Sequence, residues 1–263
     1  MIAIETKSLR SRNGKLLSPA AEAERSIIKK FRKTIWNPFV GGIKDYHLIQ
    51  EGDAIAVCIS GGKDSMLLAK CMQHLQKYSE IPFSVQYLVM DPGYTPQNRQ
   101  KIVDNAARLE IPIRIFDSPI FRVVEQAGGS PCYLCARMRR GILHNLCLEL
   151  GISKLALGHH FDDAVQTFFM NLFYGGKIGC FSPKTFLSRK QITVIRPLVF
   201  CEEREIKGAA RRLDLPVVKS ACPADGVTAR KDTEELVKKL EKDFPHLRQK
   251  VLGAMQRAGL DGW

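Results

Sequence analysis

The stretch Ile55–Ser65 reads I-A-V-C-I-S-G-G-K-D-S, and it predicts a strand, a tight glycine turn and the start of a helix. The apolar run ends abruptly before the glycines, and a helical pattern, M-L-L-A, follows at once. Such a turn presents backbone N–H groups and the positive end of a helix dipole to an anion, typically a phosphate. We therefore expect a phosphate site formed by Ser60, Gly61, Gly62, Lys63, Asp64 and Ser65.

Each residue type in this turn suits a phosphate group. The two glycines let the backbone approach the anion closely, the serine hydroxyls can donate hydrogen bonds, and Lys63 adds a mobile positive charge. Asp64 would repel a bare phosphate, so its presence predicts a bound Mg²⁺. The spacing differs from the P-loop of common nucleoside triphosphatases, which requires four residues between a glycine and Gly-Lys-Ser/Thr.

The composition indicates a globular protein with a substantial core. The chain has 263 residues, enough for one large domain or a domain with appendages, and 45% of them are hydrophobic. No stretch approaches the roughly 20 apolar residues of a membrane span, and residues 1–15 lack the apolar core of a signal peptide. We therefore expect a cytoplasmic protein without membrane contact. Its eight cysteines are then thiols or metal ligands rather than disulfides.

The charge distribution favours a polyanionic partner. The formal net charge is +13, and residues 1–50 hold ten Lys and Arg against four Asp and Glu. Basic groups near a nucleotide site fit the binding of an RNA backbone, although a solvated basic surface would also explain them. No recognisable RNA-binding module with stacking aromatic residues is present. The candidate RNA-binding residues are Lys29, Lys30 and Arg32, on a basic amphipathic helix expected over residues 21–35, and Arg137, Arg139 and Arg140, beside a cysteine pair.

Strand and helix patterns alternate along the middle of the chain. Strands are expected at 54–59, 83–90, 113–116, 154–157, 192–196 and 216–219, and helices near 65–78, 97–109, 119–126, 136–150, 162–173 and 202–213. This alternation predicts an α/β fold: a doubly wound, mostly parallel sheet with helices on both faces. Residues 231–258 read as two further helices, with Pro245 starting the second. We divide the chain into a basic N-terminal arm (1–45), the α/β domain (46–225) and C-terminal helices (226–263).

A second polar cluster follows the strand expected at 154–157. The sequence G-H-H-F-D-D occupies residues 158–163 and opens a helix. Because parallel strands end at one edge of a sheet, Gly158 and Ser60 are expected to share one crevice. Asp162 and Asp163 could hold Mg²⁺ or position a nucleotide, although capping of the helix would also explain Asp162. A zinc protease is excluded because H-E-x-x-H is absent.

Two sets of residues follow from this second cluster. The candidate catalytic residues are Lys63, Asp64, Asp162 and Asp163, and the phosphate-site residues are joined by Gly158 and His159 as nucleotide contacts. The helix that follows is apolar nearly all round over residues 165–174, so we expect it to be buried.

Three cysteines are expected in loops. Cys132 and Cys135 form a C-x-x-C pair before the helix at 136–150, and Cys222 follows the strand at 216–219. Three loop thiolates would suit a [4Fe–4S] cluster with one open iron, but the spacing does not fit a ferredoxin. The alternatives are structural zinc with Cys180 or a histidine as fourth ligand, or a metal-free persulfide mechanism. The expected buried thiols are Cys58, Cys71 and Cys147.

Five motifs together carry a resemblance to known enzymes. The S-G-G-K-D-S segment looks like the PP-loop of the ATP pyrophosphatases, which cleave ATP between its α- and β-phosphates. With C-Y-L-C-A-R-M-R-R-G, L-G-H-H-F-D-D-A-V-Q-T, N-L-F-Y-G-G-K and I-R-P-L, the chain resembles the tRNA 2-thiocytidine synthetases (TtcA-type) over roughly residues 45–220. The resemblance weakens towards the C-terminus, where family members often have a second C-x-x-C and this chain has only Cys222.

The resemblance implies an ATP-dependent tRNA sulfurtransferase. It implies ATP, Mg²⁺ and a [4Fe–4S] cluster on Cys132, Cys135 and Cys222, with the C2 oxygen of a cytidine adenylated and then replaced by sulfur. The partners would be tRNA and a sulfur donor, either a cysteine desulfurase persulfide or sulfide. One subunit is small for a whole tRNA, which favours a homodimer. The alternatives are lysidine formation, thiolation of another base, or a non-catalytic iron–sulfur or zinc protein.

Overall fold

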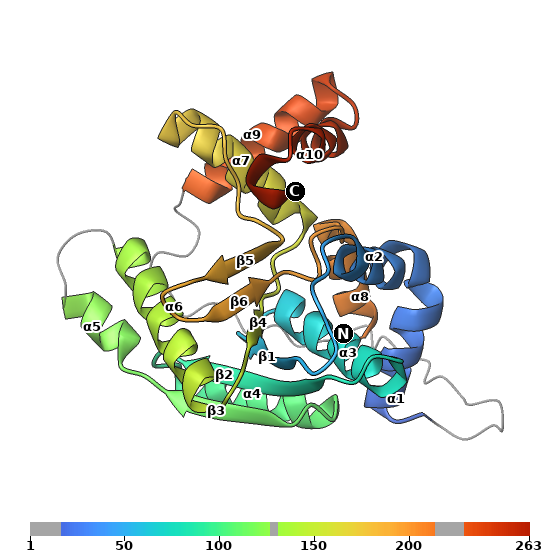
Figure 1. Cartoon of the computed structure of the whole chain (residues 1–263), viewed down its shortest axis with the longest axis vertical. Helices are drawn as coiled ribbons and strands as arrows, with labels where there is room; N and C mark the ends of the chain where they lie inside the picture. Colours follow the sequence, from blue (N-terminus) through green and yellow to red (C-terminus); the bar gives the residue numbers. More distant parts are fainter. Residues whose placement is uncertain (1–16, 127–130, 214–228) are drawn as a thin grey trace, which may run out of the picture.

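The computed structural model describes residues 17–126, 131–213 and 229–263, without the side chains of 131–133. Its centre is a six-stranded sheet in the order β3-β2-β1-β4-β6-β5 (Figure 1). The strands are β1 (Ala54–Ile59), β2 (Ser84–Asp91), β3 (Ile113–Asp117), β4 (Lys154–Ala156), β5 (Lys184–Leu187) and β6 (Ile192–Ile195). All neighbours pair in parallel except β5 with β6. The predicted mostly parallel α/β fold is confirmed.

Helices alternate with these strands as expected. The helices that follow the strands are α3 (Lys63–Tyr78), α4 (Pro96–Arg108), α5 (Ile120–Gln126), α6 (Pro131–Glu149), α7 (Phe161–Gly175) and α8 (Glu203–Arg212). The C-terminal helices are α9 (Ala229–Asp243) and α10 (Leu247–Arg257), so the two expected there are confirmed, with α10 starting two residues after Pro245. No helix in the described ranges is both long and apolar enough to cross a membrane.

Two sequence predictions about elements were wrong. The edge strand β5 was missed because it is only four residues long, contains Lys184 and buries few of its side chains. Helix α6 starts at Pro131 rather than near residue 136, so the C-x-x-C pair lies within the helix and not in a loop before it. Proline is favoured in the first turn of a helix, where no N–H donor is needed. The expected strand at 216–219 lies outside the described residues.

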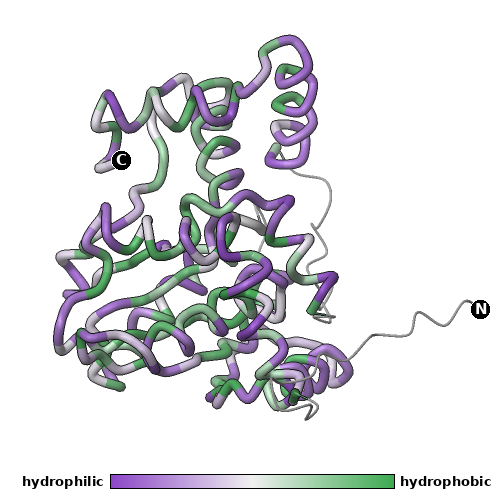
Figure 2. Tube along the Cα trace, turned by 90° about the vertical axis from the view of Figure 1, so that its right-hand side faces the viewer, coloured by the Kyte–Doolittle hydropathy of each residue, from purple (hydrophilic) through white to green (hydrophobic). Residues whose placement is uncertain are grey.

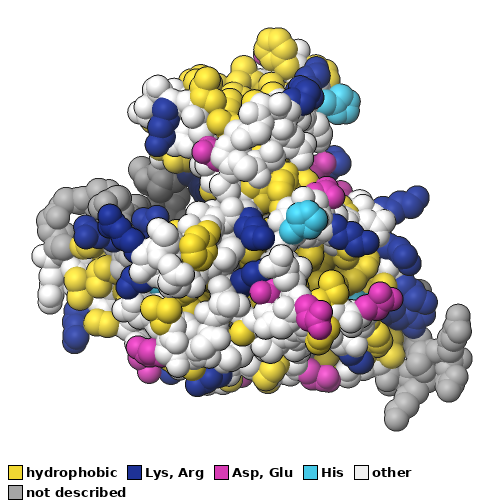
Figure 3. Space-filling model, viewed as in Figure 1, with side chains coloured by type: hydrophobic (Ala, Val, Ile, Leu, Met, Phe, Trp, Pro, Cys, Tyr) yellow, Lys and Arg dark blue, Asp and Glu magenta, His cyan; other side chains and the backbone are white. Residues whose placement is uncertain are grey.

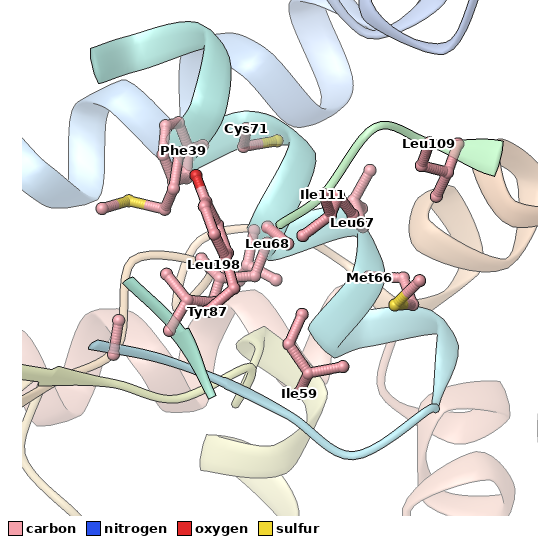
Figure 4. Close-up of a cluster of buried hydrophobic side chains, with 14 of the residues drawn as sticks. Phe39, Ile59, Met66, Leu67, Leu68, Cys71, Tyr87, Leu109, Ile111 and Leu198 are labelled. Carbon is pink, nitrogen blue, oxygen red and sulfur yellow. The ribbon is translucent and has the colours of Figure 1, made fainter. Parts of the chain in front are cut away.

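The two faces of the sheet are covered by different helices. Alternate residues of β1 serve both faces: Ile55, Val57 and Ile59 pack into a core with α3, α4, α8 and the N-terminal helices. Figure 4 shows part of this core, with Leu67 and Leu68 of α3 close to Tyr87 and Ile111. Ala56, the next residue of β1, packs instead with α5 and α6 on the opposite face. Along the tube of Figure 2, the helices therefore alternate between hydrophobic and hydrophilic stretches.

The N-terminal segment is helical but not one regular α-helix. It comprises α1 (Pro19–Arg25), two π-helical turns (Ser26–Lys30 and Arg32–Trp36) and α2 (Asn37–Asp45). Its apolar residues Ala23, Ile27, Ile35 and Phe39 are buried in the core beside α3. The predicted packing of its apolar stripe against the main domain is therefore confirmed.

The C-terminal helices pack against α7. Phe161, Ala164, Val165 and Phe169 of α7 form a third core with α9, α10 and Trp263, and Figure 1 shows these helices grouped above the sheet. The expectation that α7 is buried throughout was wrong, because its last turn, including Leu172, Phe173 and Tyr174, is exposed.

We predict that Asp53→Ala destabilises the fold strongly. Lys154 of β4 is buried, and its Nζ lies 2.6 Å from Asp53 Oδ2 and donates to the Leu48 carbonyl oxygen. Removing the carboxylate leaves a buried charge without its counterion, so the free energy of unfolding should fall by about 3–5 kcal/mol. Urea denaturation measures the change.

Lys238→Ala serves as the control for this prediction. It breaks the exposed pair between Lys238 and Glu234, which should contribute only about 0–1 kcal/mol. Equal losses in the two variants would contradict the prediction.

Candidate nucleotide site at the strand ends

The phosphate loop, residues 60–65, has the strand–turn–helix geometry that the sequence predicts. Gly61 adopts a φ of +79°, and Gly62 caps the N-terminus of α3. The Ser65 hydroxyl closes the turn from inside: it accepts the Ser60 N–H at 3.1 Å and donates to the Gly62 carbonyl at 3.0 Å. The loop is therefore held in shape by its own serine at the positive end of a helix dipole, as an anion site requires.

Lys63 lies between two carboxylates. Its Nζ is 3.1 Å from Asp64 Oδ2 and 3.2 Å from Oε1 of Glu203, which is the first residue of α8. Burial lowers the pKa of Lys63, but the two carboxylates outweigh it and hold that pKa above its ordinary value. The ammonium is therefore charged and already paired within the protein.

Glu203 is a site residue that sequence reasoning missed. Its other oxygen accepts from Lys207 at 2.8 Å, and the two lysines hold the pKa of Glu203 below its ordinary value despite burial. The signal was the acidic run E-E-R-E after I-R-P-L, at the start of a helix. Acidic residues at that position also stabilise a helix, which hides such a role in the sequence.

The loop after β4 packs directly against the phosphate loop, as expected. A Cβ atom on Gly158 would lie 3.2 Å from the backbone carbon of Asp64 and 3.2 Å from the backbone nitrogen of Ser65. Only a glycine lets the two backbones come this close. The structure therefore brings the two predicted motifs together.

The buried histidine at this contact is His160, whereas the sequence analysis had selected His159. His160 Nε2 lies 3.8 Å from Asp64 Oδ1 and 3.5 Å from Asp163 Oδ2, and its backbone N–H donates to Asp163. Asp64 Oδ1 and His160 Nδ1 are buried without a hydrogen-bond partner among the described residues. Buried polar atoms without partners are rare, so these two are suited to receive a ligand or ion.

A magnesium ion fits this arrangement in part. Mg²⁺ is usually held by one or two carboxylates together with substrate phosphates and water, and Asp64 offers an unused oxygen beside the phosphate loop. The described residues contain no group of three His, Cys, Asp or Glu arranged to hold a metal by themselves. Magnesium would therefore enter with the nucleotide.

His159 belongs to an aromatic cluster. Its ring lies 5.2 Å from the ring of Phe181. The Arg196 guanidinium lies 4.8 Å over the same Phe181 ring, and the Phe181 carbonyl accepts a hydrogen bond from the Trp263 indole N–H. Burial, with the nearby Arg196 guanidinium, lowers the pKa of His159 to about 4. The imidazole is therefore neutral near pH 7.

The two aspartates expected to be catalytic have different surroundings. Asp162 is buried, and both of its oxygens are used: one accepts the Glu203 N–H at 2.6 Å and the other accepts from Arg248 at 2.7 Å. It therefore ties α7 to α8 and α10, which is more than the simple capping considered from sequence. Asp163 shares the His160 ring with Asp64: it lies 3.5 Å from His160 Nε2, accepts from the His160 N–H and lies 3.4 Å from Arg230.

Helix α6, which carries Cys135, is linked to the phosphate loop through aromatic contacts. The Tyr94 hydroxyl donates to the Ser60 carbonyl at 3.2 Å. The Tyr94 ring lies 6.3 Å from the Phe121 ring, and the Arg139 guanidinium of α6 lies 5.8 Å over that same ring. Cys132 is in the first turn of α6, but its side chain and all of Cys222 lie outside the described residues. The three cluster ligands therefore stay a prediction.

The remaining thiols are packing groups. Cys71 and Cys147 are fully buried and Cys58 partly so, and burial raises the pKa values of these thiols to about 12, 11 and 12 respectively. The prediction of buried thiols is thus confirmed for Cys71 and Cys147. Cys180, considered as a zinc ligand, donates to the Ala164 carbonyl, and burial raises its pKa to about 12.

The two groups of basic residues do not lie together. Lys29, Lys30 and Arg32 are exposed on the N-terminal helices, which cover the α3 face of the sheet. The arginines of α6 are on the opposite face, where Arg137 and Arg140 are exposed and Arg139 lies over the Phe121 ring. Their contacts to RNA stay a prediction.

Comparison with known proteins places this site in a family. Residues 22–230 match the family described as the PP-loop domain. The tRNA-cytidine(32) 2-sulfurtransferase of Syntrophotalea carbinolica is 39% identical over 222 residues, which are 81% of this chain and 84% of that protein. The same enzyme of Geobacter metallireducens is 35% identical over 232 residues, 86% of this chain and 90% of that one.

A solved structure shows the same fold. It is the U34-tRNA thiolase NcsA from Methanococcus maripaludis with its [4Fe–4S] cluster, with a TM-score of 0.67 and 22% identity over 95% of this chain and 84% of that one. At this identity the likeness establishes the architecture alone. The family match and the curated relatives agree: this chain belongs to the PP-loop family and, within it, to the family of the tRNA-cytidine(32) 2-sulfurtransferases.

Proposed function

We propose that this protein uses ATP to replace the C2 oxygen of a tRNA cytidine by sulfur, at position 32 as in the names of its relatives. One observation carries the proposal. The loop shaped for phosphate is linked to the helix of the C-x-x-C pair by a run of contacts, from Ser60 to Tyr94, from Tyr94 to Phe121 and from Phe121 to Arg139 of α6. These contacts support a function in which ATP activation and sulfur transfer occur near each other.

The nucleotide would bind with its phosphates on the loop at residues 60–65. No side chain caps the start of α3, so its first N–H groups can meet the phosphate oxygens, and Lys63 would exchange a carboxylate for a phosphate. The Ser60 hydroxyl, which donates to Ser65 Oγ at 3.2 Å, would have to turn to join them. A bound Mg²⁺ would neutralise phosphate charge beside Asp64. Lys63 then stabilises the negative charge that develops on the leaving pyrophosphate.

The reaction needs two substitutions. The cytidine C2 oxygen first attacks the α-phosphorus, its bond to phosphorus forms, and pyrophosphate leaves with the electrons of the broken P–O bond. A sulfur nucleophile then attacks C2, the C2–O bond breaks, and AMP leaves with the former base oxygen. No net oxidation occurs when the sulfur donor is sulfide. The target base must be unstacked, which an anticodon loop allows.

The cysteines would bind the group that delivers sulfur. A [4Fe–4S] cluster on Cys132, Cys135 and Cys222 would supply a coordination position for the incoming sulfur. Cys135 is half-buried on α6, the helix that contacts the phosphate loop through Arg139, Phe121 and Tyr94, which supports a group held there acting on a substrate bound at that loop.

We predict that Lys63→Ala abolishes most of the activity. The variant loses the cation that stabilises the pyrophosphate, so the rate of 2-thiocytidine formation should fall by about 100-fold or more. The rate is measured by mass spectrometry of nucleosides from tRNA incubated with ATP and sulfide. Lys207→Ala removes the other lysine bound to Glu203 and should retain most activity. A fully active Lys63→Ala enzyme would refute the assignment, and a wild-type product that requires lysine would indicate lysidine formation.

We predict that Cys222→Ala loses both its iron and its thiolation activity. The wild-type protein, purified without oxygen, should contain about four irons per chain with visible absorption. Cys180→Ala should keep that iron, because Cys180 packs within the protein core. If the wild type contained zinc instead of iron, or if Cys180→Ala lost the bound metal, the structural zinc site would be favoured.

We predict that Gly158→Ala weakens ATP binding. The added methyl group would collide with the backbone of Asp64 and Ser65 and push the phosphate loop away. Equilibrium dialysis with ATP should show about tenfold weaker binding or more, because a lost hydrogen bond to a charged group costs about 1.5–3 kcal/mol and about 1.4 kcal/mol is a tenfold change in affinity. Gly141→Ala, on α6 with open space around it, is the control. Unchanged ATP affinity in Gly158→Ala would mean that the loop does not depend on this contact.

A further inference from the structure

The C-terminal end of α7 exposes a group of large apolar side chains. Leu172 is 37% exposed, Phe173 52% and Tyr174 62%, and Ile178 follows at 71%. Single exposed apolar residues are ordinary, but a cluster within one helix turn and its loop marks an interaction surface. We call Phe173, Tyr174, Lys177 and Ile178 the α7 platform.

Phe173 is held in place from one side. Its ring stacks on the buried ring of Phe169, with centroids 5.6 Å apart and planes inclined by 12°. Phe169 in turn packs edge-to-face with Phe168. Because one face of the Phe173 ring is fixed inside the protein, the rest can be presented to a partner at little entropic cost.

The loop after α7 is also fixed. Gly176 ends the helix in the left-handed conformation, with a φ of +57°. Asn171 then holds the loop twice: its carbonyl accepts from the Lys177 N–H, and its side-chain amide donates to Gly179. The Lys177 side chain runs past Gly175, 3.6 Å from where a Cβ would lie. The Lys177 side chain therefore lies along the last turn of α7, which also carries Phe173 and Tyr174.

The charge around the platform selects the kind of partner. Residues 164–201 contain no Asp or Glu, but they contain Lys177, Lys184, Arg189, Lys190 and Arg196. Figure 3 shows hydrophobic groups on the upper part of the molecule, over α7, α9 and α10, with Lys and Arg beside them. Exposed aromatic rings next to cations bind single-stranded nucleic acid by stacking and by phosphate attraction.

A second copy of this chain fits this surface less well. In a two-fold symmetric dimer the same patch faces itself, so Lys177 of each subunit would meet a surface where the carboxylate beside Gly179, that of Asp261, already accepts from the Cys180 N–H. Like charges brought together in an interface oppose association. The chemistry of the platform therefore favours an RNA strand.

We propose that the α7 platform binds unpaired nucleotides of the tRNA, with bases stacked on Phe173 and Tyr174 and a phosphate near Lys177. This inference rests on the proposed function, because it takes tRNA as the substrate. Helix α7 has 15 residues and spans about 20 Å from the site at its start to the platform at its end. The platform would thus hold nucleotides other than the one that reacts.

The test is the affinity of Tyr174→Ala and Phe173→Ala for unmodified tRNA, measured by fluorescence anisotropy without ATP. Each loss of a stacking ring should weaken binding about tenfold or more, whereas Tyr174→Phe should bind like the wild type. The control is Tyr78→Ala, because Tyr78 is equally exposed at 61% and also has a lysine beside its ring, but lies at the far end of α3. ATP affinity should be unchanged in all variants.

Different outcomes separate the two proposals. If the wild-type protein binds tRNA but both alanine variants bind it equally well, the platform is not an RNA site although the proposed function stands. If the wild type neither binds nor thiolates tRNA, the proposed function itself fails. If the alanine variants bind tRNA normally but sediment as monomers while the wild type is a dimer, the platform is a contact between subunits and the inference is overturned.

Discussion

The site depends on the close contact between Gly158 and the N-terminus of α3. Two strands, β1 and β4, pair in parallel and end at the same edge of the sheet, but pairing alone leaves side chains between the loops that follow. The absence of a Cβ at Gly158 brings the loop after β4 against the backbone of Asp64 and Ser65. Asp64, His160 and Asp163 consequently form one polar group, although Asp64 is about a hundred residues away from the other two in sequence.

A chain of charged contacts connects this site to the C-terminal helices. Lys63 pairs with Glu203, the Glu203 N–H donates to Asp162, and Asp162 accepts from Arg248 of α10. Asp162, Glu203 and Arg248 also line a pocket of about 300 Å³ between α7, α8, α9 and α10. A nucleotide phosphate that draws Lys63 away from Glu203 would leave Glu203 with Lys207 alone. Movement at the phosphate loop would therefore alter the contacts that Asp162 makes with Glu203 of α8 and with Arg248 of α10.

The sequence predicted the parts of this protein that depend on local patterns. The strand before the glycine turn, the helix after it and the alternation of strands and helices all follow from hydrophobic period and turn residues, and all were found. It did not predict the short edge strand β5, which lacks an apolar pattern of its own. Nor did it single out His160, because which of the two neighbouring histidines lies beside Asp64 depends on the backbone after β4. Glu203 was missed for the same reason, since its partner Lys63 is 140 residues away and no local pattern links them.

The placement of the cationic groups constrains how a tRNA could lie on this protein. Lys29, Lys30 and Arg32 are on one face of the sheet and Arg137, Arg139 and Arg140 on the other, so a straight helical segment cannot reach both. A third surface that could attract RNA is the segment at residues 164–201, which contains no Asp or Glu. It starts beside the nucleotide site and runs along α7 to the exposed rings of Phe173 and Tyr174. An RNA that enters with its reactive base near His160 can follow α7 outward and place its neighbouring bases on the platform. Under the proposed function, the α6 arginines would be left for the backbone next to the reactive base, and the N-terminal cations for a more distant part of the RNA.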